Sequence, residues 1–311
     1  MIHHIKYLVI KMKCSVFAPS HITGFFEIID HKEPLKKGSR GAGIALDRGV
    51  VTCLDISDKT SSSTSVMEVT INGKEDAKNS TITHKTLEIM EKKYNVKNLL
   101  DGRMLKIDHG VDIPIGAGFG ISAACALGTA LTITNILELN LTYNQATSIA
   151  HLAEIEMQSG LGDVVAEVNG GITFRIKEGA PGVGILDKML LNNEDDLYII
   201  CKSLGGIETS EIIGDPMHKD RINRTGGNML KELLKNPVPE TFLKLSKKFA
   251  LNTQLMSKEV SEIINILEDE TMGASMAMLG NTAFSISKTP ETSLDDAIIA
   301  GIDHYGCRYI G

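Results

Sequence analysis

The chain has 311 residues, a length that fits two domains or one large one. Its net charge of −7 and its aromatic content of 5%, without any tryptophan, argue against a nucleic-acid-binding protein and against binding to an anionic membrane. The longest apolar stretch, residues 121–139, is interrupted by polar side chains, so it predicts a buried helix rather than a membrane span. Five cysteines without a C-x-x-C pair indicate neither a disulfide framework nor a zinc site, and they favour a cytoplasmic protein.

The first half of the chain alternates β-rich runs with helical patterns. Strands are expected at residues 1–13, 15–20, 41–56 and 105–115. The polar run 59–65 predicts a connection, and Asn72-Gly73 predicts a tight turn. Helices are expected at residues 83–94, 122–139 and 143–158, the last with Thr142 as its N-cap and Gln145 at the capping-box position.

The Gly- and Pro-rich run 177–186 predicts a domain junction, so we expect an N-terminal domain of residues 1–185 and a C-terminal domain of residues 186–311. The second domain is expected to contain a strand, a lysine-rich helical section, a glycine-flanked apolar segment and a final helix, at residues 196–204, 221–267, 272–286 and 295–306. Strands in both halves indicate an α+β or α/β protein.

The most informative segment is a glycine loop, P-I-G-A-G-F-G-I-S-A-A at residues 114–124, between an expected strand and an expected long helix. Its glycines let backbone N–H groups converge, and the helix that begins near Ser122 adds the positive end of its dipole, so the loop predicts a phosphate site. A turn packed tightly for steric reasons is the structural alternative. The match to G-x-G-x-x-A also allows a dinucleotide site, but the position of the acidic ribose ligand then falls inside the helix, near Glu138. A Walker loop is excluded because no Gly-Lys-Ser/Thr follows the glycines.

Three residues, one at the end of this loop and two further along the chain, have the chemistry that phosphoryl transfer requires. Ser122 lies where the loop becomes helix, so its hydroxyl can face both a metal and a phosphate. Glu154 lies among apolar residues of an expected helix, so it is either a cation ligand or a solvated residue, with Glu156 as the competing choice. Asp163 follows Gly162, where it could hold a substrate hydroxyl or cap the next helix.

Three separate segments resemble the motifs of the GHMP kinase superfamily, which includes galactokinase, homoserine kinase and mevalonate kinase. The glycine loop is similar to the second motif, P-x-x-x-G-L-G-S-S-A-A, with Phe119 and Ile121 in place of Leu and the first Ser. Residues 18–27 resemble the first motif, and residues 273–286 resemble the third. The resemblance implies a two-domain α+β fold, with an N-terminal nucleotide-binding half similar to S5 domain 2 and a ferredoxin-like C-terminal half. It implies an ATP site formed by Pro114, Gly116, Ala117, Gly118, Phe119, Gly120 and Ser122.

Within the superfamily, residues 21–26, 38–43, 118–124 and 159–171 resemble the archaeal pantoate kinases. The resemblance implies phosphorylation of the 4-hydroxyl of (R)-pantoate with ATP and Mg²⁺, a step toward coenzyme A, and it suggests a homodimer. It implies that Ser122 and Glu154 hold Mg²⁺ and that Asp163 is the base or orients the hydroxyl. The alternatives are another GHMP kinase, acting on mevalonate, homoserine or shikimate, and a non-catalytic nucleotide-binding regulator on the same fold.

The carboxylate of pantoate requires a cation, for which Arg175 is the first choice and Arg40 the second. Thr209 is expected to reach substrate hydroxyls across the domain junction. His151 is expected on the same helix face as Glu154, where it contacts substrate, hydrogen-bonds the carboxylate or is structural. His21 stands where mevalonate kinases have Lys, so a cation beside the nucleophile is absent or comes from another residue.

Overall fold

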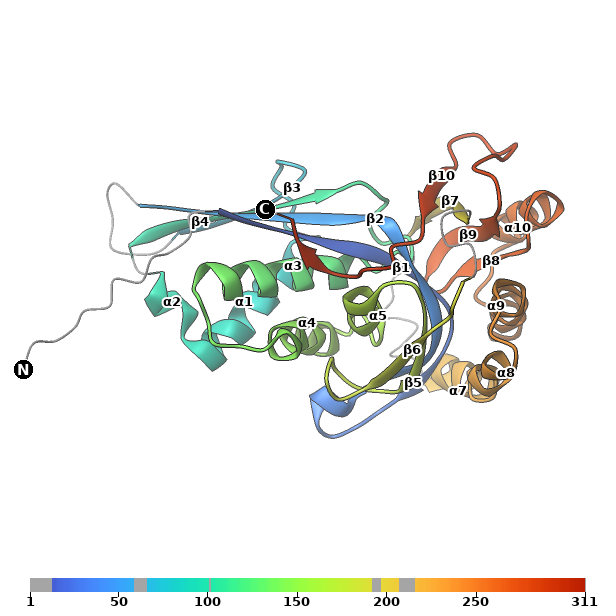
Figure 1. Ribbon diagram of the computed structural model, residues 1–311, viewed down its shortest axis with the longest axis horizontal. Coiled ribbons are helices and arrows are strands. Elements are labelled where there is room, and N and C mark those ends of the chain that lie inside the picture. Colours follow the sequence, from blue (N-terminus) through green and yellow to red (C-terminus); the bar gives the residue numbers. More distant parts are fainter. Residues whose placement is uncertain (1–12, 59–65, 101, 192–196, 207–215, 311) are drawn as a thin grey trace, which may run out of the picture.

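The computed structural model describes residues 13–58, 66–100, 102–191, 197–206 and 216–310. Two antiparallel-rich sheets of different size, each covered by helices, form the molecule (Figure 1). The expected α+β class is confirmed. The strand expected at residues 1–13 and the connection at 59–65 lie outside the described residues, apart from Lys13.

The larger sheet has the strand order β11-β1-β2-β4-β3, and β5 and β6 extend it beside β2. Its strands are β1 (Lys13–Ile29), β2 (Gly38–Asp58), β3 (Val66–Ile71), β4 (Arg103–Val111), β5 (Ile172–Lys177), β6 (Ile185–Lys188) and β11 (Arg308–Tyr309). All pairs are antiparallel except β3 with β4. The pairing of β1 with β2 shifts register between Pro19 and Ser20 and again between Thr23 and Phe25, and both strands curve strongly there (Figure 1). This curvature brings one end of β1 toward the second sheet.

Helices cover one face of the larger sheet (Figure 1). They are α1 (Thr81–Tyr94), α2 (Val96–Leu99), α3 (Ile121–Ile136), α4 (Tyr143–Met157) and α5 (Asp163–Asn169), with the short 3₁₀ helix η1 (Pro34–Lys36) beside α4. Helix α3 is apolar on every side because β1 and β2 cover one face and α1 and α4 cover the others. The predicted capping box of α4 is confirmed: Gln145 N donates to Thr142 Oγ1 at 3.2 Å, and Thr142 N donates to Gln145 Oε1 at 2.8 Å.

The second sheet has the antiparallel order β10-β7-β9-β8. It comprises β7 (Tyr198–Gly206), β8 (Ala274–Ala277), β9 (Gly280–Ser287) and β10 (Ile298–Gly301), with helices α7 (Pro216–Gly226), α8 (Met229–Lys235), α9 (Pro239–Thr253) and α10 (Lys258–Glu270). Aromatic side chains join it to the larger sheet. The ring of Phe242 on α9 lies 6.4 Å from Phe25 of β1 and 6.1 Å from Phe284 of β9, so the two halves share a continuous core.

The prediction of a helix at residues 295–306 is wrong, because this segment contains the edge strand β10 (Ile298–Gly301). Ile298 and Ile299 pair with Cys201 and Ile200 of β7, and β-branched side chains suit such a half-buried strand. The predicted junction after residue 185 lies at the start of β6, which pairs with β5, and β7 begins the second sheet at Tyr198. The division at 185/186 stays a prediction.

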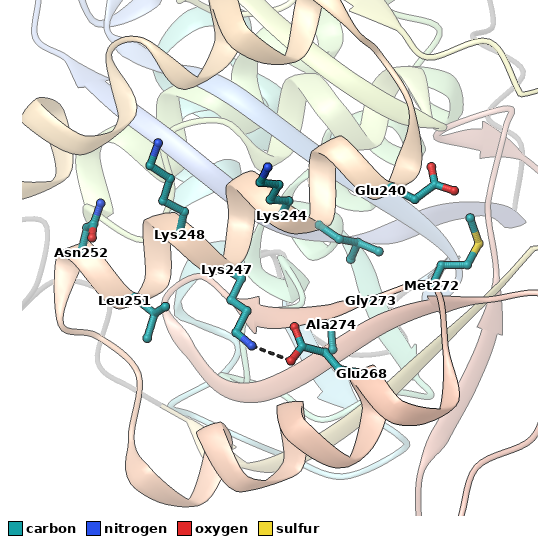
Figure 2. Close-up of a pocket in the computed structure, with 11 residues that line it drawn as sticks. Glu240, Lys244, Lys247, Lys248, Leu251, Asn252, Glu268, Met272, Gly273 and Ala274 are labelled. Carbon is teal, nitrogen blue, oxygen red and sulfur yellow. Dashed lines mark hydrogen bonds and ion pairs between the residues drawn. The ribbon is translucent and has the colours of Figure 1, made fainter.

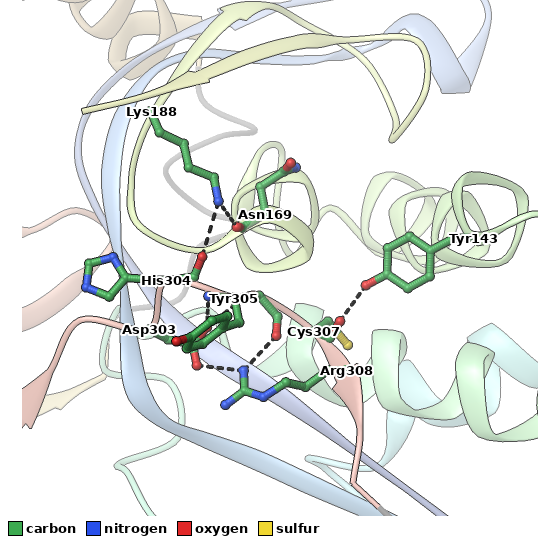
Figure 3. Close-up of polar contacts among 9 residues, drawn as sticks. Tyr143, Asn169, Lys188, Asp303, His304, Tyr305, Cys307 and Arg308 are labelled. Atoms are coloured by element: carbon green, nitrogen blue, oxygen red, sulfur yellow. Dashed lines mark hydrogen bonds and ion pairs between the residues drawn. The ribbon is translucent and has the colours of Figure 1, made fainter. Parts of the chain in front are cut away.

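The C-terminal segment, residues 303–309, returns to the larger sheet and lies against the end of α5 (Figure 3). Cys307 N donates to the carbonyl of Glu167 at 2.8 Å, and the Tyr143 hydroxyl donates to the carbonyl of Cys307 at 2.6 Å. Asp303, which is almost fully buried, accepts an ion pair from Arg308 at 2.7 Å. These contacts connect α4, α5 and β11.

Candidate active site

A cavity of about 740 Å³ lies where the two halves meet. The glycine loop, the segment from Met157 to Asp163, the start of α1 and the turn between β8 and β9 line it. A second cavity, of about 390 Å³, lies between α9, α10 and β8 and is lined by Lys244, Lys247, Lys248, Glu240 and Glu268 among others (Figure 2). None of its lining residues belongs to the glycine loop or to the predicted catalytic set, so the larger cavity is the candidate active site.

The glycine loop forms a tight turn at the start of α3, and the phosphate site stays a prediction. Gly116, Gly118 and Gly120 have φ of 76°, 89° and 68°, a left-handed conformation that glycine adopts without steric cost. A side chain on Gly118 would lie 3.0 Å from the Cα of Gly280, so the loop sits directly on the β8–β9 turn. Helix α3 begins at Ile121, and its N-terminal N–H groups have no partner within the helix.

Most, but not all, residues of the predicted ATP site line the cavity. Gly116, Gly118, Phe119, Gly120 and Ser122 do so. Ala117 is buried and its carbonyl accepts a hydrogen bond from Thr282 at 2.8 Å, and Pro114 is exposed outside the lining. These two residues shape the loop rather than face the cavity.

Ser122 and Glu154 meet at the start of α3. The Ser122 hydroxyl donates to Glu154 Oε1 at 2.6 Å, and Ser159 donates to the same oxygen at 2.7 Å. Burial and, to a smaller extent, the charge of Asp163 raise the pKa of Glu154 to about 7, although the two hydroxyl hydrogen bonds oppose the shift. A carboxylate and a hydroxyl are hard oxygen donors that suit Mg²⁺. No cluster of three or more His, Cys, Asp or Glu that could hold a metal occurs among the described residues.

Asp163 begins α5 beside His21 of β1. The two side chains are joined by a hydrogen bond of 2.7 Å from His21 Nδ1 to Asp163 Oδ1, and the Asp163 side chain is 24% exposed, toward the cavity. Burial raises the pKa of Asp163, but the hydrogen bonds from His21 and Thr23 and the charge of Arg175 outweigh it, so the pKa lies below its ordinary value. Burial likewise lowers the pKa of His21, more than Asp163 raises it. A neutral imidazole that donates through Nδ1 therefore fixes the orientation of an ionised Asp163.

Arg175, on β5, is the cation nearest to this pair. Its side chain is 2% exposed, it lines the cavity, and Nε and Nη1 have no hydrogen-bond partner among the described residues. Burial lowers its pKa to about 10 while Asp163 opposes that shift, so the guanidinium remains charged at neutral pH. A buried cation with unused donors beside a cavity is suited to an anionic group of a ligand.

The other predicted substrate contacts lie elsewhere or outside the described residues. His151 Nε2 donates to the carbonyl of Lys37 at 3.0 Å, away from the cavity lining, and burial lowers its pKa to about 4. Arg40 forms an ion pair with Glu178 at 2.7 Å and does not line the cavity. His21 is fully buried behind Asp163. Thr209 lies outside the described residues.

The structure also adds residues that the sequence did not single out. Thr23 and Ser159 hydrogen-bond Asp163 and Glu154, but a lone hydroxyl near a motif gives no distinguishing pattern. Glu167 is fully buried four residues after Asp163, a spacing that places both on one helix face and could have identified it. The turn before α1 contributes Lys78 and Asn79 to the cavity lining, and the first residue of α1 contributes Thr81.

Sequence similarity to known proteins identifies the family. A pantoate kinase of Methanocaldococcus jannaschii is 39% identical over 283 residues, which cover 91% of this chain and 95% of that protein. A pantoate kinase of Thermococcus kodakarensis is 36% identical and covers 90% of this chain and 89% of that protein. This chain belongs to the pantoate kinase family. Residues 81–171, which include the glycine loop, Glu154 and Asp163, also match the GHMP kinase N-terminal domain.

A solved structure described as a phosphotransferase related to the CoA biosynthesis pathway has the same fold as this member of the pantoate kinase family. The TM-score is 0.82 at 31% identity, and the match covers 96% of this chain and 98% of the other. The expected GHMP kinase fold is therefore confirmed. Among the helices of the described residues, none combines the length and apolarity that a bilayer span requires.

Proposed function

We propose that this chain transfers the γ-phosphoryl group of ATP to the 4-hydroxyl of pantoate. The observation that carries the proposal is that one cavity gathers three different kinds of group: the glycine loop with the start of α3, the hydroxyl of Ser122, and Asp163 with the partnerless donors of Arg175. Glu154 does not line the cavity itself, but it accepts the hydrogen bond of Ser122, which does. A phosphoryl-transfer site needs a phosphate cradle, metal ligands and a group that receives the hydroxyl proton.

Ser122 and Glu154 are the residues that would hold Mg²⁺. The hydroxyl and the carboxylate already lie 2.6 Å apart, and the position of a Gly160 side chain would overlap Glu154 Oε2, so glycine at 160 keeps that oxygen uncovered. When bound, the metal neutralises charge on the transferring phosphates. The N–H groups of the loop and of α3 are the complementary neutral donors to those phosphates.

Asp163 is the residue that orients the attacking hydroxyl. Its ionised carboxylate accepts a hydrogen bond from the 4-hydroxyl, and it receives the proton as the new P–O bond forms. The low pKa of Asp163 makes it a weak base, which suits a proton transfer that comes late, when the hydroxyl oxygen has already lost electron density to phosphorus. His21 keeps the carboxylate from rotating away.

Arg175 is the residue that would bind the carboxylate of pantoate. Its Nε and Nη1 have hydrogen-bond donors without partners, which are available to an anionic group, and the close approach of Gly162, where a side chain would lie 2.7 Å from Nε, holds the guanidinium in place. The cation thus anchors the acid end of the substrate while Asp163 receives the hydroxyl end.

The proposal is tested by ADP release from ATP and Mg²⁺ with (R)-pantoate, mevalonate, homoserine or shikimate as acceptor. We expect turnover with pantoate alone. Asp163→Asn should lower kcat by a factor of about 10² or more with little change in KM, because general-base groups contribute on that scale. Arg175→Lys should raise KM for pantoate roughly tenfold and leave KM for ATP unchanged. Turnover with another acceptor, or an Arg175→Lys variant with normal KM for pantoate, contradicts the assignment.

A further inference from the structure

Glu167 is a buried carboxylic acid beneath the glycine loop that the steps above do not use. It lies on α5, one helical turn after Asp163, and its side chain is fully buried. The position of a Gly120 side chain would overlap Glu167 Oε1 and would lie 3.4 Å from the Cβ of Asp163. Glu167 therefore touches the backbone at the residue where the loop ends and α3 begins.

Neither carboxyl oxygen of Glu167 has a hydrogen-bond partner among the described residues. Leaving a polar group buried and unpaired destabilises the fold, whereas an apolar side chain of similar size would fill the same space without that cost. The position is thus a poor one for a carboxyl group if packing is its only role. A group that interacts with the loop when the loop is loaded fits the position better.

The charged groups around Glu167 disfavour its ionised form. They are Asp163 on the same helix and Glu154 on α4, and the nearby thiols are Cys125 of α3 and Cys307 of the C-terminal segment. The neutral side chain of His21 lies beyond Asp163, on β1. Burial, with the two negative charges, raises the pKa of Glu167 well above its ordinary value. This environment favours the uncharged acid, which has one O–H donor.

We propose that Glu167 is a positioning residue for phosphoryl transfer, whose carboxyl group supports the last turn of the glycine loop and sets its distance from Asp163. The inference rests on the proposed function, since it concerns the phosphates bound by that loop. In its neutral form the group adds no negative charge beneath the phosphates. Once ionised, it repels them, and the affinity for ATP falls.

The test compares the unmodified protein with Glu167→Gln, which keeps the shape and stays neutral, and Glu167→Asp, which is one methylene shorter and still ionises. The affinity for a non-hydrolysable ATP analogue with Mg²⁺ is measured by calorimetry from pH 6 to pH 9.5. The control variant is Glu156→Gln, on α4 and paired with Lys85 outside the cavity. Melting temperature, kcat and KM are measured at pH 7.

We expect Kd of the unmodified protein and of Glu156→Gln to rise more than about threefold at alkaline pH, whereas Glu167→Gln lacks most of that rise and keeps kcat within about twofold at pH 7. Glu167→Asp should lower kcat roughly tenfold, since the loop loses its support. The proposal is overturned if Kd of the unmodified protein is flat with pH, if Glu167→Gln retains the full rise, or if a folded Glu167→Asp turns over normally. Failure of the proposed function is seen separately, as missing ADP release with an unchanged pH profile of binding.

Discussion

Glu154 and Asp163 face each other across Gly160. The position of a Gly160 side chain would lie 3.2 Å from Asp163 Oδ2 and would overlap Glu154 Oε2. Two carboxyl groups so close repel when both are ionised, and this repulsion adds to the burial that raises the pKa of Glu154. The pKa of Asp163 stays below its ordinary value because His21, Thr23 and Arg175 favour its ionised form. The site without ligand is therefore less stable than it would be with a single charge.

This charge pair predicts a pH-dependent gain in stability for Glu154→Gln. The pKa of Glu154 rises from 4.5 to about 7 on folding, so its favourable contribution is complete below pH 4.5 and is lost as the pH rises through 7. Glutamine does not titrate and keeps the hydroxyl contacts. Without nucleotide, the free energy of unfolding of the variant relative to the unmodified protein should increase by up to about 3 kcal/mol between pH 5 and pH 8. Urea unfolding at both pH values checks this, and an equal difference at the two contradicts it.

Single residues of the site were predictable where a motif and a chemical need coincide. Ser122, Asp163 and Arg175 were predicted from such coincidences, and all three line one cavity. Helical spacing was a less reliable guide to the residues of the site, because it shows which residues share a helix face but not which groups pack against that face. His151 shares α4 with Glu154 but meets the carbonyl of Lys37, a backbone group with no sequence signature. The roles assigned to these residues stay predictions until the variants are measured.

At the scale of elements, the glycine loop and the β8–β9 turn form one unit. A side chain on Gly280 would overlap the carbonyl of Ala117, and Thr282 donates to that carbonyl at 2.8 Å. The turn thus fixes the loop from the opposite half of the molecule. The resemblance to two separate motifs did not reveal this contact, because only the tertiary structure brings them together.

Gly280→Ala should consequently weaken ATP binding without touching the cavity's polar groups. The added methyl group displaces the loop backbone, and we expect Kd for an ATP analogue to rise roughly tenfold, or about 1.4 kcal/mol. Gly110→Ala is the matched control, because the nearest atom to its added methyl group is 3.6 Å away, an ordinary contact on β4. Calorimetry measures the affinity of both variants for the ATP analogue. Equal affinities would mean that the β8–β9 turn does not hold the glycine loop in place.

Helices with a regular apolar spacing or an N-cap residue were predicted closely, whereas a strand that depends on pairing with a distant strand was not. Helices α1, α3 and α4 match the expected helices to within a few residues, because apolar spacing and the Thr142 cap mark them locally. Residues 295–306 carry an equally apolar run, yet Ile298 and Ile299 join the edge of β7. Edge pairing depends on a partner about a hundred residues away, and no local pattern reports it.

At the scale of the whole molecule, the C-terminal segment stabilises the larger sheet. Arg308 is paired with the buried Asp303 at 2.7 Å and lies 4.7 Å from the ring of Phe17 on β1. Arg308→Met leaves Asp303 without its cation, so the free energy of unfolding should fall by about 1–3 kcal/mol. Arg224→Met, which removes an exposed ion pair with Asp220 on α7, should change it by less than about 0.5 kcal/mol. Thermal unfolding of both variants tests this prediction. Similar losses of stability in the two variants would contradict a special role of the Arg308–Asp303 ion pair.

The contact of the C-terminal segment with α5 has a consequence for protein synthesis. Helix α5 carries Asp163 and Glu167, and its main chain is bonded by Cys307, while β11 pairs with β1. A ribosome that has made only the first 300 residues has already exposed the whole glycine loop and both predicted magnesium ligands. The helix beside them still lacks its last neighbours, and the strand made earliest still has an open edge. These contacts with α5 and β1 should therefore form only after residues 303–309 have emerged from the ribosome, so we expect the site to be completed late, after the residues that compose it have been made.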